Sequence, residues 1–334
     1  MEKLKMGYEK EKAEIIFWGK ELHRQGLLSG SSGNISWRVQ KDHILMTAHG
    51  SYLGYLTEDD IVLVDLEGQV VEGKKAPTSE TGLHLSIYRN FPEETIVLHA
   101  HSPYTVYFFH HFSSLTQVSF EERFCLGKVP VVPQYTPTVV DLAPVIEALK
   151  LNHIVVLKNH GVVAMGNDFR KVFSLIELLE TQAKLNLTFR FPKPPAEKAI
   201  GLLASEKYAP FSHEHLKALI NLVNSDREIQ EFGEKFQLSG KFCLQDTTNK
   251  KTFCLHYQRG KITAFSESET EADFVISAEH NIWQHVFKGK IDPFAAVSQG
   301  KLKVIKGNFL EFSRWYPVFE RIFALWQKIG IKTS

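Results

Sequence analysis

The sequence predicts a two-domain protein whose first domain is of the α/β class. Two observations favour two domains. The 334 residues exceed the usual size of a single hydrophobic core, and a proline-rich segment at residues 192–195 separates two series of helix and strand patterns. We therefore expect a first domain over residues 1–195, a linker over 196–210 and a separate α+β domain over 211–334.

In the first domain, helices are expected where apolar residues recur at helical spacing, and strands where short β-branched runs lie between glycine or acidic turns. The expected elements are a helix at 9–25, strands at 34–39, 43–46 and 61–65, a helix at 80–89, a strand at 95–101, a loop-rich stretch with Pro130, Pro133 and Pro137, a second β-branched run that ends at Gly161, and a helix that Asp168 caps and that runs to about Phe191.

The second domain is expected to begin with a helix and to continue with alternating strand-like runs. Its expected elements are a helix at 215–232, strand-like runs around 242–244, 253–257, 262–265 and 274–276, a helix near 281–287, a strand at 302–305 and an aromatic-rich helix at 312–329. No acid, base or metal-ligating residues cluster there in the sequence, so catalysis is expected in the first domain.

Charge and cysteine content restrict the function further. The 39 basic and 38 acidic residues balance, and no basic cluster indicates nucleic-acid binding, so small-molecule chemistry is expected. No apolar run is long enough to span a bilayer, so a soluble, cytoplasmic protein is expected. The cysteines Cys125, Cys243 and Cys254 are expected to be reduced packing thiols, although Cys243 and Cys254 could pair across two strands.

Three histidines are candidate metal ligands. His99 and His101 alternate within a strand-like run and therefore point to the same side, while His160 lies where a β-branched run meets Gly161. Three imidazoles with an open fourth position are typical of catalytic zinc. The alternative is that they are partly buried histidines at strand ends, hydrogen-bonded to backbone.

Three short segments are suited to binding an anion. Residues 30–36 and 47–50 are turns that offer backbone amides and hydroxyls, and Thr78 and Ser79 lie at a helix start, where unpaired amides favour a phosphate or carboxylate. Turn and cap formation is the alternative explanation for each segment.

These segments together resemble the class II aldolase/adducin family over about residues 6–190. The resemblance rests on five motifs that occur in the family's order: Ser32-Gly33-Asn34-Ile35-Ser36, Thr47-Ala48-His49-Gly50, Pro77-Thr78-Ser79-Glu80, His99-Ala100-His101-Ser102 and Asn159-His160-Gly161. It implies an α/β/α fold around a mostly antiparallel sheet, assembled as a homotetramer with active sites at subunit interfaces.

The resemblance also assigns roles to residues. It implies that His99, His101 and His160 bind a divalent metal, with Zn²⁺ preferred, and that Glu80 is the acid/base. It further implies a substrate phosphate pocket lined by Gly33, Asn34, Thr47, Gly50, Thr78 and Ser79. The expected function is a metal-dependent lyase acting on a phosphorylated or carboxylated hydroxycarbonyl compound, such as a sugar phosphate or oxo acid, through a metal-stabilised enediolate. A pKa raised by partial burial would make Glu80 a usable base.

Two departures from the family pattern leave the reaction open. Phe120 aligns where fuculose-phosphate-type aldolases use a tyrosine, and a whole domain stands where they have a short tyrosine-bearing tail. Glu122 lies near the acid/base of related dehydratases, although a solvated surface charge is the alternative interpretation. Dehydratase, decarboxylase and epimerase activity therefore remain alternatives, as does a non-catalytic adducin-like scaffold. His49, His84, His110 and His111 are assigned no role.

The second domain resembles the sterol carrier protein 2 family over about 120 residues. The resemblance rests on the segments 272–277, 287–293 and 300–307. It implies a five-stranded sheet covered by helices, with an apolar tunnel that could hold a lipid. Candidate lining residues are aromatic, namely Phe312, Trp315, Phe319, Phe323 and Trp326, but ordinary core packing is the favoured interpretation for most of them.

Overall fold

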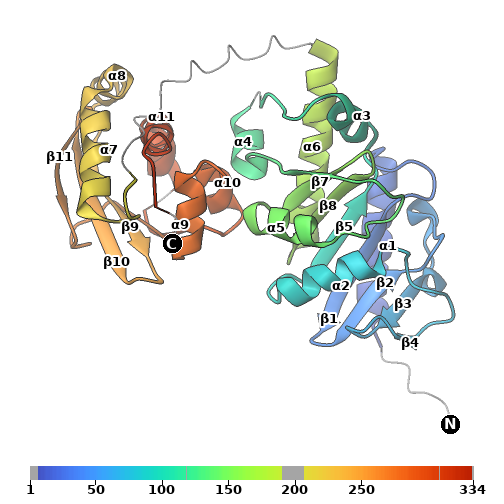
Figure 1. Cartoon of the computed structure of the whole chain (residues 1–334). Coiled ribbons are helices and arrows are strands. Elements are labelled where there is room, and N and C mark those ends of the chain that lie inside the picture. The colour runs from blue at the N-terminus through green and yellow to red at the C-terminus, as the bar shows by residue number, and fades with distance from the viewer. Residues whose placement is uncertain (1–6, 118, 190–206, 308, 333–334) are drawn as a thin grey trace. The chain divides into compact units, whose positions relative to one another are not determined.

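The computed structural model describes residues 7–117, 119–189, 207–307 and 309–332, of which residues 189 and 309–314 are described in their backbone only. The chain forms two compact units, Met1–Lys193 and Pro194–Ser334 (Figure 1). Each unit is considered by itself. The expected linker at 196–210 lies mostly outside the described residues.

The first unit is built on an eight-stranded sheet in the order β4-β3-β2-β1-β5-β8-β7-β6. All neighbouring strands are antiparallel except β6 and β7, which are parallel. The strands are β1 (Asn34–Gln40), β2 (His43–Thr47), β3 (Ile61–Val64), β4 (Val70–Glu72), β5 (Ile96–Ala100), β6 (Val131–Pro133), β7 (Ile154–Lys158) and β8 (Gly161–Gly166). The mostly antiparallel sheet implied by the family resemblance is confirmed.

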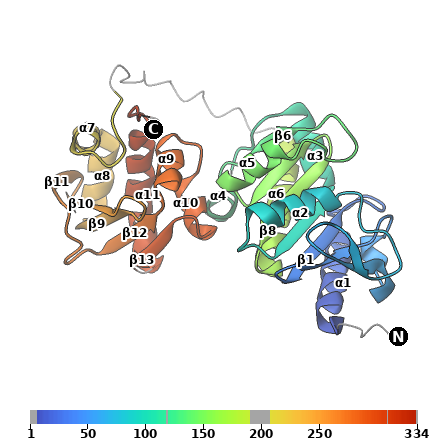
Figure 2. The same ribbon diagram turned by 60° about the horizontal axis from the view of Figure 1, so that its bottom comes forward.

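Helices cover both faces of this sheet (Figure 1 and Figure 2). One hydrophobic cluster joins the sheet to α1 (Glu9–Arg24), α3 (Pro103–His111) and α6 (Phe169–Phe189). A second cluster, on the opposite face, joins it to α2 (Thr81–Asn90) and α5 (Ala143–Leu151). The three layers match the expected α/β/α fold.

The expected loop-rich stretch after the histidine strand is wrong in part. It contains α3, α4 (Phe120–Leu126) and α5, besides the short strand β6. Prolines occupy the first turns of α3 and α5, where the missing N–H costs nothing. Proline therefore marks helix starts here. The remaining short elements are 3₁₀ turns at Leu53–Tyr55 and Glu58–Asp60.

The second unit has a five-stranded sheet in the order β11-β10-β9-β12-β13, as the second resemblance implied. Its strands are β9 (Ser239–Asp246), β10 (Lys251–Gln258), β11 (Lys261–Ser266), β12 (Phe274–Ala278) and β13 (Lys303–Lys306). Its helices are α7 (His213–Ser225), α8 (Arg227–Lys235), α9 (His280–Phe287), α10 (Pro293–Ser298) and α11 (Phe309–Trp326). Trp315, Phe319, Phe323 and Trp326 of α11 are buried, while the side chain of Phe312 lies outside the described residues.

The helix expected at 215–232 is two helices. Asp226 has extended backbone angles and separates α7 from α8, and its side chain accepts a hydrogen bond from the backbone N–H of Ile229. An aspartate in this position ends one helix and caps the next.

The expectation of reduced thiols is wrong for two of the three cysteines. Cys243 and Cys254 form a disulfide. They are directly paired in the β9–β10 register, and both are fully buried. Because the two β-carbons of such a pair lie close together, the pairing of the strands brings the sulfurs within bonding reach.

Candidate metal centre and its surroundings

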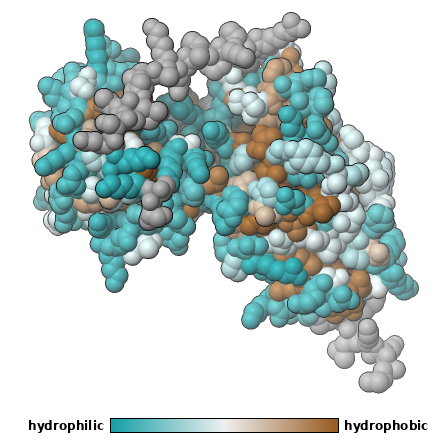
Figure 3. Space-filling view, in the orientation of Figure 1, coloured by the Kyte–Doolittle hydropathy of each residue, from teal (hydrophilic) through white to brown (hydrophobic). Residues whose placement is uncertain are grey.

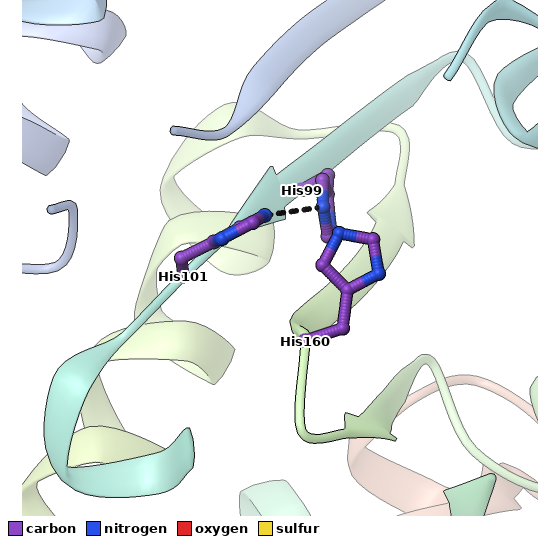
Figure 4. Close-up of side chains that lie close together, drawn as sticks. All are labelled: His99, His101 and His160. Carbon is purple, nitrogen blue, oxygen red and sulfur yellow. Dashed lines mark hydrogen bonds between the residues drawn. The ribbon is translucent and has the colours of Figure 1, made fainter. Parts of the chain in front are cut away.

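Three imidazoles converge where the central strand β5 of the first sheet ends. His99 is on β5, His101 follows that strand directly, and His160 lies in the tight turn between β7 and β8 (Figure 4). One ligand nitrogen from each lies within 4.8 Å of the others. Among the residues that the structure describes, this is the group of metal-ligating side chains that could share one ion.

Backbone geometry explains how His160 reaches the other two. Asn159 adopts the left-handed conformation with φ of 65°, which reverses the chain before His160. A β-carbon at Gly161 would lie 2.5 Å from the carbonyl oxygen of Ala100. Only glycine therefore allows β8 to approach the end of β5 this closely.

The hydrogen bonds leave lone pairs available on the cluster. Nδ1 of His99 lies 2.9 Å from the carbonyl oxygen of Val162 and must donate to it. Its Nε2 is therefore unprotonated, 3.0 Å from Nε2 of His101. Nδ1 of His160 is buried and has no hydrogen-bond partner among the described residues. This nitrogen lies on the far side of the ring, and Nε2 of His160 is the nitrogen on the side of His99 and His101 (Figure 4). The bare Nε2 of His99 beside the two other converging imidazoles fits a divalent cation.

Burial keeps these rings neutral. It lowers the pKa of His99 well below its usual range, with smaller effects from His101 and His160. Burial, followed by the charge effect of His160, lowers the pKa of His101 to about 4, and burial also lowers the pKa of His160. Neutral imidazole is the form that binds a metal.

Glu80 lies next to the cluster, directly before α2. Its carboxylate is buried, lies 3.9 Å from Nε2 of His160, and accepts a hydrogen bond from the backbone N–H of Val139 at 3.2 Å. Burial raises the pKa of Glu80, and the hydrogen bond from Val139 offsets part of the rise. The structure thus brings together the predicted acid/base and the predicted metal ligands.

The residues expected to bind the substrate anion lie on three neighbouring segments. Asn34 opens β1 opposite His99. Thr47 ends β2, and its carbonyl oxygen accepts from the backbone N–H of Thr78, which ties β2 to the segment before α2. The hydroxyl of Thr47 accepts from the N–H of Ile35, and the hydroxyl of Thr78 accepts from the N–H of Glu80.

The glycines and the serine of this set are placed differently. A β-carbon at Gly33, which has φ of 85°, would lie 2.7 Å from the carbonyl oxygen of His99, so this position needs glycine. Gly50 also has positive φ, in the turn after Thr47, and Ser79 is exposed. The three segments therefore meet beside the three-histidine cluster, with backbone amides and an exposed hydroxyl at their tips.

Glu122 is not the solvated surface charge that was one interpretation. It is buried, and its carboxylate accepts from the backbone N–H of Ser119, which forms a capping box at the start of α4. Phe120, aligned with the family tyrosine, is 67% exposed on the same helix.

Sequence reasoning missed one wall of the site. An open hollow of about 680 Å³ borders His101 and His160 and runs along the face of α3 that carries Val106, Tyr107 and His110. Nδ1 of His110 lies 2.7 Å from the side-chain oxygen of Asn159, the residue before His160. The spacing of these residues on α3 was the available signal, because positions three and four apart share one helix face. Apolar residues also gather on the surface around β5, β7 and β8 in the view of Figure 3.

The fold and the cluster define a three-layer α/β protein with a candidate three-histidine metal centre. Residues 13–187, more than half of the chain, match the Class II Aldolase and Adducin N-terminal domain. The chain belongs to the class II aldolase and adducin family. Residues 226–312 match the SCP-2 sterol transfer family, so both resemblances found in the sequence are confirmed. Among the residues that the structure describes, each helix is too short or too polar to span a bilayer.

Curated relatives match the first unit. An L-fuculose phosphate aldolase of Methanocaldococcus jannaschii is 36% identical over 178 residues, which are 53% of this chain and 96% of that protein. A 3-oxo-tetronate 4-phosphate decarboxylase of Pectobacterium atrosepticum is 34% identical over 187 residues, covering 53% of this chain and 84% of that protein.

Solved structures agree on the fold of the first unit. An L-fuculose 1-phosphate aldolase matches with a TM-score of 0.52 and 28% identity, covering 57% of this chain and 91% of that chain. The L-fuculose-1-phosphate aldolase of Thermus thermophilus matches with a TM-score of 0.50 and 29% identity, covering 55% of this chain and 95% of that chain.

Proposed function

We propose that the protein is a metal-dependent lyase that cleaves a phosphorylated or carboxylated hydroxycarbonyl compound. The observation that carries the proposal is the convergence of three neutral imidazoles beside the buried carboxylate of Glu80. His99, His101 and His160 would hold the ion, and Zn²⁺ suits three nitrogen ligands with an open fourth position.

The substrate class follows from the relatives and from the site. The relatives are named for sugar phosphates and for an oxo acid phosphate. The segments with Gly33, Asn34, Thr47, Gly50, Thr78 and Ser79 would bind the phosphate or carboxylate, partly through backbone amides at the start of α2. Binding energy at that anion would orient the reacting carbons at the cluster.

A bound divalent ion would polarise the substrate carbonyl and stabilise negative charge on its oxygen. The protein supplies the proton transfer. Glu80, whose pKa is raised by burial, would take a proton from the substrate hydroxyl or carbon and return it after the bond breaks. The layers of the fold shield the carboxylate from water, which strengthens its interaction with the reacting atoms.

The test is a screen of sugar phosphates and 2-oxo acids with metal-loaded full-length protein, with product release followed by mass spectrometry. Protein from which the metal has been removed with a chelator is the control. Turnover of at least one phosphorylated compound that requires metal would support the proposal. Absence of bound metal after metal-replete expression would contradict it and favour the non-catalytic scaffold.

A dehydratase is the second candidate. Glu122 is buried, which is uncommon for a carboxylate, and it lies near the position expected for the dehydratase acid/base. Its carboxylate accepts from the N–H of Ser119, so a capping role explains it as well. Replacing Glu122 with glutamine separates the two. Loss of turnover comparable to that in Glu80→Gln, with unchanged thermal stability, would support dehydration.

For the second unit we propose an apolar ligand, since buried aromatic residues of α11 pack against its sheet. The ring of Trp315 lies 5.2 Å from that of Tyr257 and 6.0 Å from that of Phe274.

A shortened chain ending at Lys198 should keep its metal and its proposed tetrameric state, which light scattering would measure. A fluorescent fatty-acyl probe should bind the full chain and bind more weakly to Trp315→Gln. Loss of metal from the shortened chain would show that the second unit completes the active site.

A further inference from the structure

A chain of buried polar side chains connects β1 with α2. Along β1, Asn34 and Ser36 alternate onto the sheet face that α2 covers, since residues two apart on a strand share a face. On α2, His84 and Tyr88 are one turn apart and meet them. All four residues are at most 6% exposed, and His84 is completely buried. Polar groups so placed in a core need partners, and here they partner one another.

The direction of each hydrogen bond follows from the chemistry of the groups. Nε2 of His84 lies 2.5 Å from Oδ1 of Asn34, and an amide oxygen only accepts, so Nε2 carries the proton. Burial lowers the pKa of His84 to about 3, so the ring is neutral and its Nδ1 is a bare acceptor. Nδ1 therefore accepts from the hydroxyl of Ser36 at 2.6 Å, and Oγ of Ser36 accepts from the hydroxyl of Tyr88 at 2.7 Å.

This series of hydrogen bonds runs from Tyr88 through Ser36 and His84 and ends on the side-chain oxygen of Asn34. The amide nitrogen of Asn34 keeps both of its protons and donates no hydrogen bond among the described residues. It is not one of the fully buried atoms that lack a partner, so it reaches the surface of the protein. Asn34 is paired directly with His99 across β1 and β5, and side chains of such a pair lie on the same face. The free NH₂ group therefore belongs to the face of the sheet that carries the metal cluster.

We propose that His84, backed by Ser36 and Tyr88, is a positioning residue that fixes the NH₂ group of Asn34 toward the substrate. The orientation selects a ligand with an anionic acceptor oxygen at that point, a phosphate or a carboxylate. The inference rests on the proposed function for its substrate class. Without the donor from His84, the amide of Asn34 could turn over and present its oxygen, which would repel an anion.

A second anchor keeps α2 in place when the network is altered. The guanidinium of Arg38, the next residue on the same face of β1, donates to the carbonyl oxygens of Tyr88, Phe91, Pro92 and Glu94 at the end of α2. It also lies 4.9 Å from the centroid of the Tyr88 ring. Single changes at His84 or Ser36 therefore leave the end of the helix tied to the strand.

The test measures binding of inorganic phosphate and, separately, of pyruvate to metal-loaded full-length protein by calorimetry. His84→Leu should weaken binding of the preferred anion by about 10- to 100-fold, the range expected for loss of one hydrogen bond to a charged group. Ser36→Ala should weaken anion binding less, because it removes only the hydrogen bond from Ser36 to Nδ1 of His84. His84→Gln, which offers an N–H from the same position, should restore part of the affinity. The anion that the wild-type protein binds more tightly shows whether the acceptor oxygen belongs to a phosphate or to a carboxylate.

Two controls separate positioning from general loss of structure. Metal content should stay at the wild-type level in His84→Leu and Ser36→Ala. Ser86→Ala, a serine-to-alanine change on α2 outside the network, should bind the anion like wild type. Nitrogen NMR of the histidine rings should show His84 protonated at Nε2 in the wild type.

The outcomes are distinct. If the wild type binds an anion and His84→Leu binds it equally well, or if His84 is protonated at Nδ1, the positioning role is overturned while the proposed function stands. If metal-loaded wild type binds neither phosphate nor pyruvate, the proposed substrate class fails, and the positioning role fails with it.

Discussion

The two units bury histidine side chains in different ways. In the first unit, His99, His101 and His160 come from separate segments and converge with lone pairs available. In the second, His215 lies alone among aromatic rings, 5.2 Å from Phe287 by ring centroid, and its Nε2 accepts a hydrogen bond from the indole N–H of Trp326.

A lowered pKa does not distinguish these two environments. Burial lowers the pKa of His101 to about 4 and that of His215 also to about 4. The geometry differs. The rings of His99, His101 and His160 converge so that one ion could contact all three, whereas the ring of His215 packs as part of a hydrophobic core. A candidate site in a new structure is therefore better recognised by converging donors than by a perturbed pKa alone.

The largest expected effect is on metal binding. His99→Ala should lower the metal content from about one ion per chain to near zero, since two remaining imidazoles make a weak site. His215→Ala is the matched control and should keep the full metal content. Inductively coupled plasma mass spectrometry of the purified proteins checks both. Equal metal loss in the two variants would remove the distinction between the units.

The next effect is on turnover. Glu80→Gln should keep the metal and lower turnover by ~10²- to 10⁴-fold, the usual range for a general acid/base. Glu147→Gln, an exposed carboxylate paired with Lys150 on α5, should behave like the wild type. Steady-state assays on the substrate found in the screen measure this. Turnover in Glu80→Gln within a factor of two of the wild type would exclude Glu80 from proton transfer.

A smaller effect concerns the pH dependence of the second unit. The folded-state pKa of His215, about 4, is below the usual value of 6.5, so the unfolded chain binds the additional proton between these pH values. Stability should therefore be complete above pH 6.5 and fall as the pH is lowered toward 4, by on the order of 2 kcal/mol at pH 5. Protonation also removes the acceptor that Trp326 uses.

Urea unfolding of the full chain at pH 7 and pH 5, followed by hydrogen exchange in each unit, would measure this change. In His215→Phe, the loss of unfolding free energy of the second unit between pH 7 and pH 5 should be smaller by on the order of 2 kcal/mol. An unchanged pH slope in this variant would show that other groups control the acid sensitivity of the second unit.

The smallest expected effect concerns α3, the helix that follows His101. The carboxylate of Glu180 on α6 accepts from the backbone N–H groups of Tyr104 and Thr105 and from the hydroxyl of Thr105, which caps α3 directly after His101. Glu180→Gln should cost the first unit about 1–2 kcal/mol, as measured by thermal unfolding. No change in stability would show that the first turn of α3 is held by its packing alone.

The sequence contained enough to predict the central strands and to place His99 and His101 on one side of a strand, because these features depend on short-range patterns. Alternation along residues 96–101 placed His99 and His101 on one side, and Glu80 fell at a helix start as expected. The site's assembly from several segments was inferred from motif resemblance rather than from any local pattern.

Features that depend on distant partners were missed. The cap of α3, Glu180, lies 76 positions from Tyr104. His84 was assigned no role since its partners, Asn34 and Ser36, lie 50 and 48 positions away on a strand. The Cys243–Cys254 bond required knowledge of the strand pairing. Local patterns do not report which faces meet.

The alternation of Asn34, Ser36 and Arg38 on β1 also has a consequence for the path to the native state. If β1 docked one residue out of step, these three polar side chains would face the apolar layer formed by α1, α3 and α6, and Ile35 would face α2. Such a misassembled chain would bury unpaired donors and lose both the metal-side amide and the helix anchor. The alternation of these three residues therefore specifies the register of β1, since a shift by one residue would leave all three polar side chains in an apolar layer.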